Sequence, residues 1–118
     1  MIFEVESWKV AEGKEDEHRI WMRKWLKWVN THRQLFPEWK SVRYFIKDIA
    51  GKESERHMVI WEYESLSEFE DYKKRRAGYP GPYEEYKEND PYHKGVFNHQ
   101  TMQVEIWKDL ERELWIDS

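Results

Sequence analysis

The chain has 118 residues and a formal net charge of −4, from 24 acidic and 20 basic side chains, and this length predicts a single domain over residues 1–118. The mixed charges exclude the clearly basic face that nucleic-acid binding requires. No apolar run reaches the roughly 18 residues of a membrane span. The absence of Cys excludes disulfides, thiolate catalysis and Cys-ligated zinc. Eight Trp, seven Tyr and five Phe supply the apolar area for a core.

Residues 2–10 alternate in polarity, as a strand with two different faces does. We expect Phe3, Val5 and Ser7 on the face toward the helices. The opposite face then carries Ile2, Glu4, Glu6 and Trp8.

A long helix follows the first strand. Acidic residues at 15–17 favour its first turn, and aromatic and apolar residues recur at helical spacing from His18 to Phe36. Pro37 predicts that the helix ends near Leu35 or Phe36.

The second half of the chain alternates between strands and shorter helices. Residues 41–49 and 56–64 read as an antiparallel hairpin. Ser65 and Glu68 form the pattern of a capping box that opens a helix, and Lys73–Arg76 make its last turn basic. Residues 83–95 predict a short helix in a Tyr-rich segment, and residues 100–108 form a last strand. The irregular segment 79–95 is interpreted as a packed connection or as a lid over a pocket.

This order predicts an α+β, ferredoxin-like βαββαβ fold, with a four-stranded antiparallel sheet and two helices on one face. The face away from the helices is then too apolar for solvent, which favours a homodimer closed through the sheet as a dimeric α+β barrel. A monomer whose amphipathic side chains cover that face is the alternative. The large apolar residues expected there are Trp8, Phe45, Met58, Ile60 and Trp107.

The layout resembles the dimeric α+β barrel superfamily. Within it, the stretch VIWEYES at 59–65, then Leu66 and DPYHK at 90–94, is similar to NIPSNAP-like and antibiotic-biosynthesis-monooxygenase-like members. The resemblance implies a ligand site between sheet and helices, in a superfamily that contains cofactor-free oxygenases, haem-degrading enzymes and proteins without a known reaction. The Asn-Trp-His trio of the haem-degrading members has no counterpart here, so no catalytic residue is carried over.

Histidine and tyrosine are the first candidates for catalysis, because a His beside a phenol can move protons. His18 on the long helix, with His57 and Tyr44 on the hairpin, would approach one pocket from different elements. The alternative is that neither His is catalytic. His18 would then lie at the end of the apolar face of the long helix, and His57 would lie at the hairpin edge, facing water.

Candidate ligand contacts are aromatic. Trp21, Trp25 and Trp61 read first as core, but Ser7 opposite bulky rings would leave space for a flat apolar molecule.

Glu4 and Glu6 lie on one strand face about 7 Å apart. An acid–base pair or a hard metal ion would suit that distance, although ion pairing with Arg43 and Lys47 at a dimer interface is the preferred interpretation.

Two functional hypotheses follow. The first is a dimeric barrel that binds a small flat apolar molecule beneath the long helix, with cofactor-independent acid–base or oxygenase chemistry. The second is a non-catalytic dimerisation or interaction module. No metal or cofactor motif is present, and the many Glu, Lys and Arg residues without Cys are typical of a heat-adapted cytoplasmic protein.

Overall fold

The computed structural model describes residues 1–47 and 56–116. Its elements, in chain order, are β1 (Ile2–Val10), α1 (Glu15–Thr31), β2 (Ser41–Ile46), β3 (His57–Tyr63), α2 (Leu66–Arg76), α3 (Tyr83–Asn89) and β4 (Phe97–Lys108), with 3-10 turns at Arg33–Leu35, Pro91–His93 and Arg112–Leu114. Residues 48 and 49, predicted to end the second strand, lie outside the described residues.

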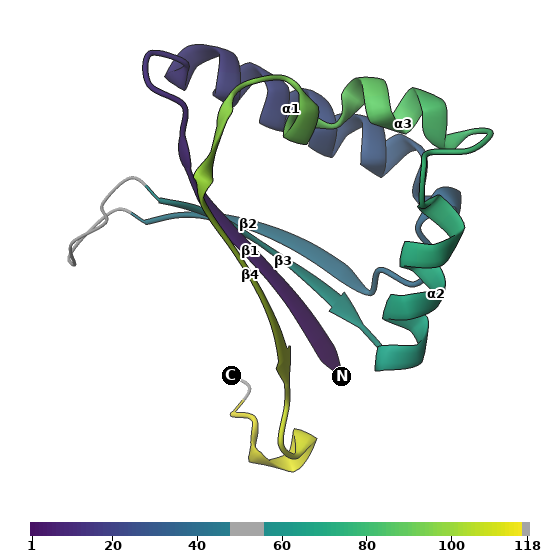
Figure 1. The fold of residues 1–118 in the computed structure, drawn as a ribbon. Helices are drawn as coiled ribbons and strands as arrows, with labels where there is room; N and C mark the ends of the chain where they lie inside the picture. Colours follow the sequence, from purple (N-terminus) through teal and green to yellow (C-terminus); the bar gives the residue numbers. More distant parts are fainter. Residues whose placement is uncertain (48–55, 117–118) are drawn as a thin grey trace.

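The strands form one antiparallel sheet in the order β2-β3-β1-β4. The helices α1, α2 and α3 all lie on one side of this sheet, and no helix of the described residues covers the other side (Figure 1). The α+β, ferredoxin-like fold predicted from the sequence is therefore confirmed.

The two faces of β1 are the reverse of the prediction. In an antiparallel pair, directly opposed residues place their side chains on the same face, and Val59, Trp61 and His57 of β3 belong to the helix-covered face. Glu4, Glu6 and Trp8 therefore face the helices, and Phe3, Val5 and Ser7 lie on the bare face. The opposed pairs are Glu4 with Trp61, Glu6 with Val59 and Trp8 with His57.

Helix α1 ends at Thr31, earlier than Pro37 predicted. The hydroxyl of Thr31 donates to the carbonyl oxygen of Trp28 at 3.0 Å, and Nδ1 of His32 lies 2.7 Å from the same oxygen. The His32 ring also stacks on the Trp28 ring, with 3.9 Å between centroids. These contacts give the Trp28 carbonyl oxygen hydrogen-bond partners in the last turn, as helix ends require. The chain then continues as a 3-10 turn.

Helix α2 begins as the sequence predicts. The Ser65 hydroxyl accepts a hydrogen bond from the backbone N–H of Glu68 at 3.2 Å. At the other end of α2, Arg75 binds both carboxylate oxygens of Glu38, at 2.5 and 2.6 Å, and donates to the Tyr83 hydroxyl at 3.0 Å. A bidentate pair of this kind fixes orientation, so α2 is held against the start of α3 and the segment after α1.

Helices α1 and α3 are joined by aromatic contacts. The indole N–H of Trp25 donates to the Tyr86 hydroxyl at 3.2 Å, and the Trp28 and Tyr86 rings stack with 5.5 Å between centroids.

No helix in the described ranges, 1–47 and 56–116, is long and apolar enough to cross a membrane.

Candidate functional site

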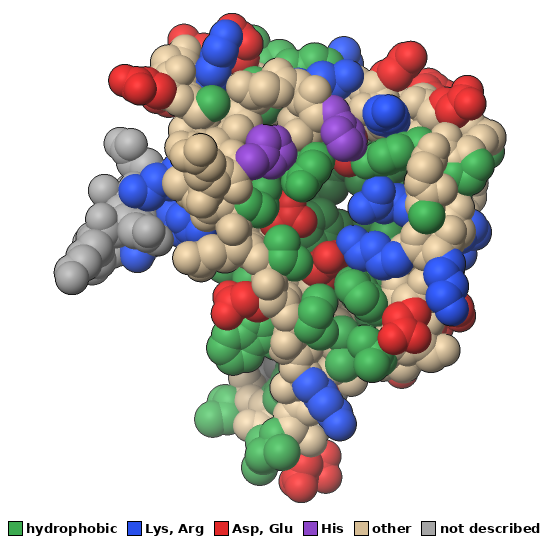
Figure 2. Space-filling model, viewed as in Figure 1, with side chains coloured by type: hydrophobic (Ala, Val, Ile, Leu, Met, Phe, Trp, Pro, Cys, Tyr) green, Lys and Arg blue, Asp and Glu red, His purple; other side chains and the backbone are tan. Residues whose placement is uncertain are grey.

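A cavity of about 440 Å³ lies between the sheet and the three helices, a size ordinary for small-molecule sites. In Figure 2 this face is hollowed, with acidic side chains in the hollow and Lys and Arg side chains on the side that α2 forms. Most of the remaining wall is aromatic. The aromatic lining residues are Trp8, Trp25, Trp39, Trp61, Tyr72, Tyr79, Tyr86, Tyr92 and Phe97.

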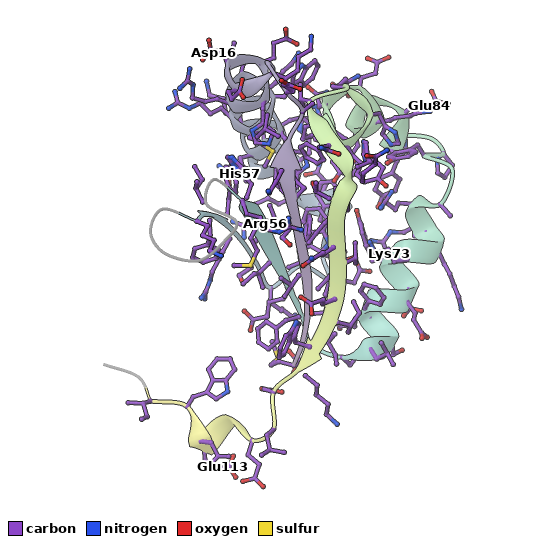
Figure 3. All side chains as sticks on the ribbon, turned by 60° about the vertical axis from the view of Figure 1, so that its left-hand side comes forward. Asp16, Arg56, His57, Lys73, Glu84 and Glu113 are labelled. Carbon is purple, nitrogen blue, oxygen red and sulfur yellow. The ribbon has the colours of Figure 1, made fainter. Side chains whose placement is uncertain are left out.

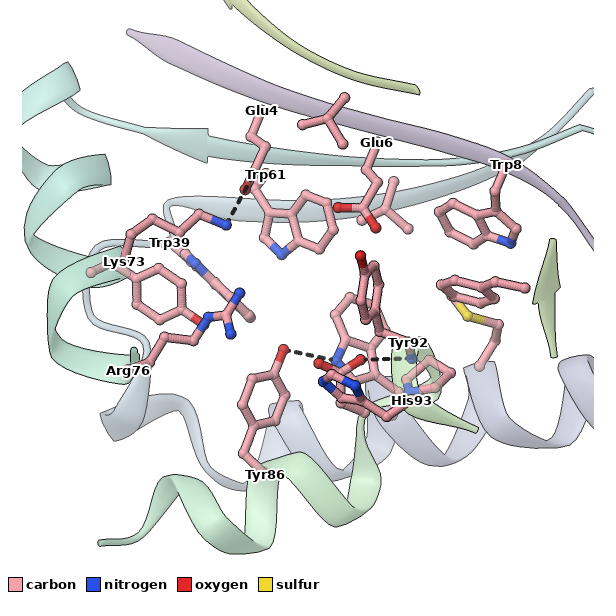
Figure 4. A pocket seen from close by; sticks show the side chains of 18 of the residues that line it. Glu4, Glu6, Trp8, Trp39, Trp61, Lys73, Arg76, Tyr86, Tyr92 and His93 are labelled. Carbon is pink, nitrogen blue, oxygen red and sulfur yellow. Dashed lines mark hydrogen bonds and ion pairs between the residues drawn. The ribbon is translucent and has the colours of Figure 1, made fainter. Parts of the chain in front are cut away.

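Glu4 and Lys73 form the charged end of this cavity. Nζ of Lys73, on α2, lies 2.9 Å from Oε2 of Glu4 on β1 (Figure 4). Glu4 is 4% exposed, and the Tyr63 hydroxyl donates to its other carboxylate oxygen at 3.4 Å. A buried carboxylate needs partners of this kind, so Glu4 is fixed in place by an ammonium group and a phenol.

Glu6 lies two residues further along β1, in the same cavity, and its carboxyl group points into the space between sheet and helices (Figure 4). Burial, together with the negative charge of Glu4, raises the pKa of Glu6 to about 7, although Lys73 acts in the opposite direction. At neutral pH this carboxyl group therefore exists in both protonation states, which is the property of a general acid–base catalyst.

Three polar groups that line the cavity have no partner. The indole N–H of Trp61, the hydroxyl of Tyr72 and Nε of Arg76 are buried and make no hydrogen bond within the part of the chain that the structure describes. Tyr72 is 1% exposed, and the Trp61 nitrogen points into the cavity (Figure 4). Native proteins rarely leave such groups unsatisfied, so these groups indicate a place for a ligand's acceptor atoms.

The segment after α2 closes the cavity on the helix side. The Tyr79 hydroxyl lies 2.9 Å from Nε2 of His93 and donates to a carboxylate oxygen of Asp90 at 3.4 Å. Burial raises the pKa of Asp90 above its usual range. The Tyr-rich segment predicted as a connection or lid thus supplies part of the wall of the cavity.

The predicted catalytic residues come together elsewhere, in a second pocket of about 650 Å³ beneath the first half of α1. The rings of His18 and His57 lie 4.5 Å apart between centroids, and the Tyr44 hydroxyl lies 2.5 Å from Nδ1 of His57. Burial, and then the neighbouring His57, lower the pKa of His18 to about 4. Figure 3 shows His57 on the sheet below α1, whereas Lys73 of the first cavity lies on α2.

Only some of the aromatic residues predicted to contact a ligand line the first cavity. Trp25 and Trp61 line it and meet edge to face, with 6.0 Å between ring centroids. Trp21 does not line it, and its ring faces the ammonium groups of Lys24 and Lys94.

The prediction that Ser7 faces the helices is wrong. Ser7 lies on the bare face, where its hydroxyl accepts a hydrogen bond from Nε of Arg56 at 3.1 Å, so it leaves no space opposite the aromatic rings. The expected ion pairing of Glu4 and Glu6 with Arg43 is wrong for the same reason, since Arg43 pairs with Ile60 on the bare face.

The Glu4–Glu6 spacing is visible in the sequence, but this pair was predicted at an interface. Local sequence patterns do not reveal that Lys73 pairs with Glu4, because Lys73 comes from a helix that is distant in sequence. Within residues 1–47 and 56–116, no group of three or more His, Asp or Glu residues is placed to hold a metal ion.

No protein-family model matches this sequence, and no curated protein matches it significantly. Solved structures share its fold. A NIPSNAP domain protein from Burkholderia xenovorans has a TM-score of 0.64 at 12% identity, over 95% of this chain and 97% of that chain. A protein described as an antibiotic biosynthesis monooxygenase has a TM-score of 0.58 at 12% identity, over 94% of this chain and 100% of that chain.

A third similar structure is a dimeric protein of ferredoxin-like fold from Bacteroides fragilis, with a TM-score of 0.61 at 7% identity, over 92% of this chain and 95% of that chain. These similarities confirm the resemblance to NIPSNAP-like and monooxygenase-like structures, and at such identities they describe the fold alone.

Proposed function

We propose that the first cavity binds a small planar molecule and that Glu6 transfers a proton to and from a carbon atom beside a carbonyl group. The observation that carries this proposal is a carboxyl group with a pKa of about 7 inside an aromatic cavity. A base poised near the operating pH is the most effective one. The aromatic walls favour a flat ligand, as the sequence suggested.

The reaction needs only the residues of the chain. The Glu6 carboxylate takes a proton from the carbon, and the electron pair of the C–H bond moves through the carbon–carbon bond to the carbonyl oxygen, which gives an enolate. Arg76 and the indole N–H of Trp61 are available to stabilise that negative charge. Glu6 then returns its proton to the enolate, so the net change is isomerisation or isotope exchange, without an oxidant.

The substrate class follows from the charges of the cavity. Lys73 and Arg76 both line it, and Lys73 is already paired with Glu4. Arg76 therefore has the charge to bind an anionic group on the ligand. A planar aromatic keto acid meets these requirements.

The test uses phenylpyruvate, an aromatic keto acid that has acidic hydrogens beside its carbonyl group and becomes planar as the enolate. Deuterium exchange at that carbon is followed by proton NMR in D2O, and oxygen uptake is recorded in parallel because an enolate also reacts with O2. We expect exchange faster than in buffer, with a rate that rises through about pH 7 and levels off above it, since the ionised Glu6 is the base. Exchange equal to that in buffer would favour the non-catalytic interaction module.

We also infer that the bare sheet face binds a second copy of this chain. Phe45 is 44% exposed and Trp107 is 57% exposed. Met58 pairs with Phe45 on this face, and the Trp115 ring lies 6.1 Å from the Phe3 ring. An apolar surface of this extent favours a partner, and an isologous contact between two copies would cover it.

Sedimentation velocity tests the dimer at micromolar concentration. The unmodified chain is expected to sediment at twice 14.8 kDa, and the double variant Phe45→Glu, Trp107→Glu as a single chain, because each interface would then bury four unpaired carboxylates. Ile20→Glu is the control, since Ile20 is 63% exposed on α1, over the opposite face. A double variant that remains dimeric would remove the bare face as the interface.

A further inference from the structure

The second pocket is separate from the cavity of the proposed reaction. The two share Met22 alone among their lining residues in the described chain. The second pocket lies between the first half of α1 and the ends of β2 and β3, and its lining combines histidine, basic and apolar side chains.

The buried His18 presents an N–H donor with a fixed orientation in this pocket. The indole N–H of Trp8 donates to Nε2 of His18 at 2.9 Å, so the neutral His18 ring carries its proton on Nδ1. The lowered pKa of His18 keeps that ring neutral at physiological pH. His18 is 1% exposed, and its Nδ1 makes no hydrogen bond with any described residue. Because His18 lines this pocket, its N–H can donate to an acceptor atom of a ligand.

The neighbouring His57 ring is held by Tyr44. Burial raises the pKa of Tyr44 to about 12, so its hydroxyl keeps its proton, and this hydroxyl lies 2.5 Å from Nδ1 of His57. The His18 and His57 rings lie 4.5 Å apart, so His57 packs beside the His18 donor and limits the space around it.

The charges at the rim favour an anion. Lys9, Arg19 and Arg23 line the pocket against a single carboxylate, that of Glu15, among the residues that the structure describes there. Arg19 is paired with Asp16 at 2.5 Å. Lys9 and Arg23 form no ion pair with other described residues, so their charges remain available to a ligand.

The rest of the wall is apolar, with Val10, Met22, Leu26 and Ile46. We propose that this second pocket binds an amphiphilic monocarboxylic acid: its carboxylate accepts the N–H of His18 near Lys9 and Arg23, and its apolar chain lies along Met22 and Leu26. The pocket volume of about 650 Å³ is in the range of sites for molecules of that size. This site is independent of Glu6 and of the proposed reaction.

Isothermal titration with decanoate tests the proposal, with decanol and decyltrimethylammonium as the uncharged and cationic probes. We expect saturable binding of decanoate alone, weakened at least tenfold by Arg23→Glu and by Lys9→Glu. The matched control is Lys27→Glu, one turn further along α1, exposed and outside every described pocket. Both kinds of variant change exposed or partly exposed charges, so folding is not at risk.

Three results would overturn the proposal. One is the absence of decanoate binding up to millimolar concentration. Another is equal weakening by Arg23→Glu and Lys27→Glu, which would indicate attraction to the whole positive surface. The last is loss of decanoate binding in Lys73→Gln, because that residue lines only the first cavity and the acid would then occupy the first cavity instead.

Discussion

Replacing Glu6 by glutamine is expected to slow the exchange of phenylpyruvate hydrogens by about 100-fold or more, the usual contribution of a positioned general base. Glutamine has nearly the shape of glutamate but cannot take up a proton, so binding in the aromatic cavity is retained and only the proton transfer is lost. The measurement is the proton NMR exchange rate at pH 8, where Glu6 is ionised.

The stability of the same variant serves to exclude misfolding. The folded-state pKa of Glu6 is about 7 against an ordinary value of 4.5, so the folded state holds this proton more tightly than the unfolded state. That contribution to stability is full below pH 4.5 and is lost as the pH rises to 7. At 1.36 kcal/mol per pKa unit, Glu6→Gln should gain at most about 3 kcal/mol in unfolding free energy at pH 8, and nothing at pH 4.

The exposed Glu12 provides a matched control. Glu12→Gln should change neither the exchange rate nor the dependence of stability on pH. If Glu6→Gln keeps the full exchange rate while its stability at pH 8 rises, the pKa of Glu6 is as described but Glu6 is not the base. If neither quantity changes, the buried environment of Glu6 is itself contradicted.

Replacing Trp8 by alanine is expected to lower the unfolding free energy by about 3–5 kcal/mol, the usual cost of deleting a large aromatic side chain from a core. Trp8 is 1% exposed, and its ring stacks on Phe97 with 4.3 Å between centroids. Its N–H is also the donor that holds His18. The measurement is urea denaturation at fixed protein concentration, because the stability of the proposed dimer would depend on that concentration.

Trp8→Phe separates packing from hydrogen bonding. Phenylalanine keeps much of the stacking but leaves Nε2 of His18 without its donor, which should cost about 1–3 kcal/mol. Ile20→Ala, at a site 63% exposed on α1, should stay within about 0.5 kcal/mol of the unmodified chain. A loss for Trp8→Ala no greater than that of Ile20→Ala would show that Trp8 does not belong to the core.

Much of the candidate chemistry was visible in the sequence as residue types, but not as sites. His18, His57 and Tyr44 were predicted to meet, and they do, because α1 crosses the hairpin end of the sheet. They were expected to share one site with Trp25 and Trp61, which line a different cavity instead. Helical spacing gives the face of a helix but not the point at which that face crosses each strand.

The elements and their order follow from local patterns, because the period of two, the period of 3.6 and the Ser65 cap depend on neighbouring residues alone. The side of β1 that faces the helices depends instead on long-range packing. Both sides of that strand carry large apolar residues, and a shift of one residue exchanges them. Trp8 is 1% exposed on the helix-covered face, whereas Phe3 is only half-buried on the bare face. Lys73 from α2 pairs with Glu4. With β1 in this orientation, Glu4 and Glu6 both line the cavity, and burial there raises the pKa of Glu6.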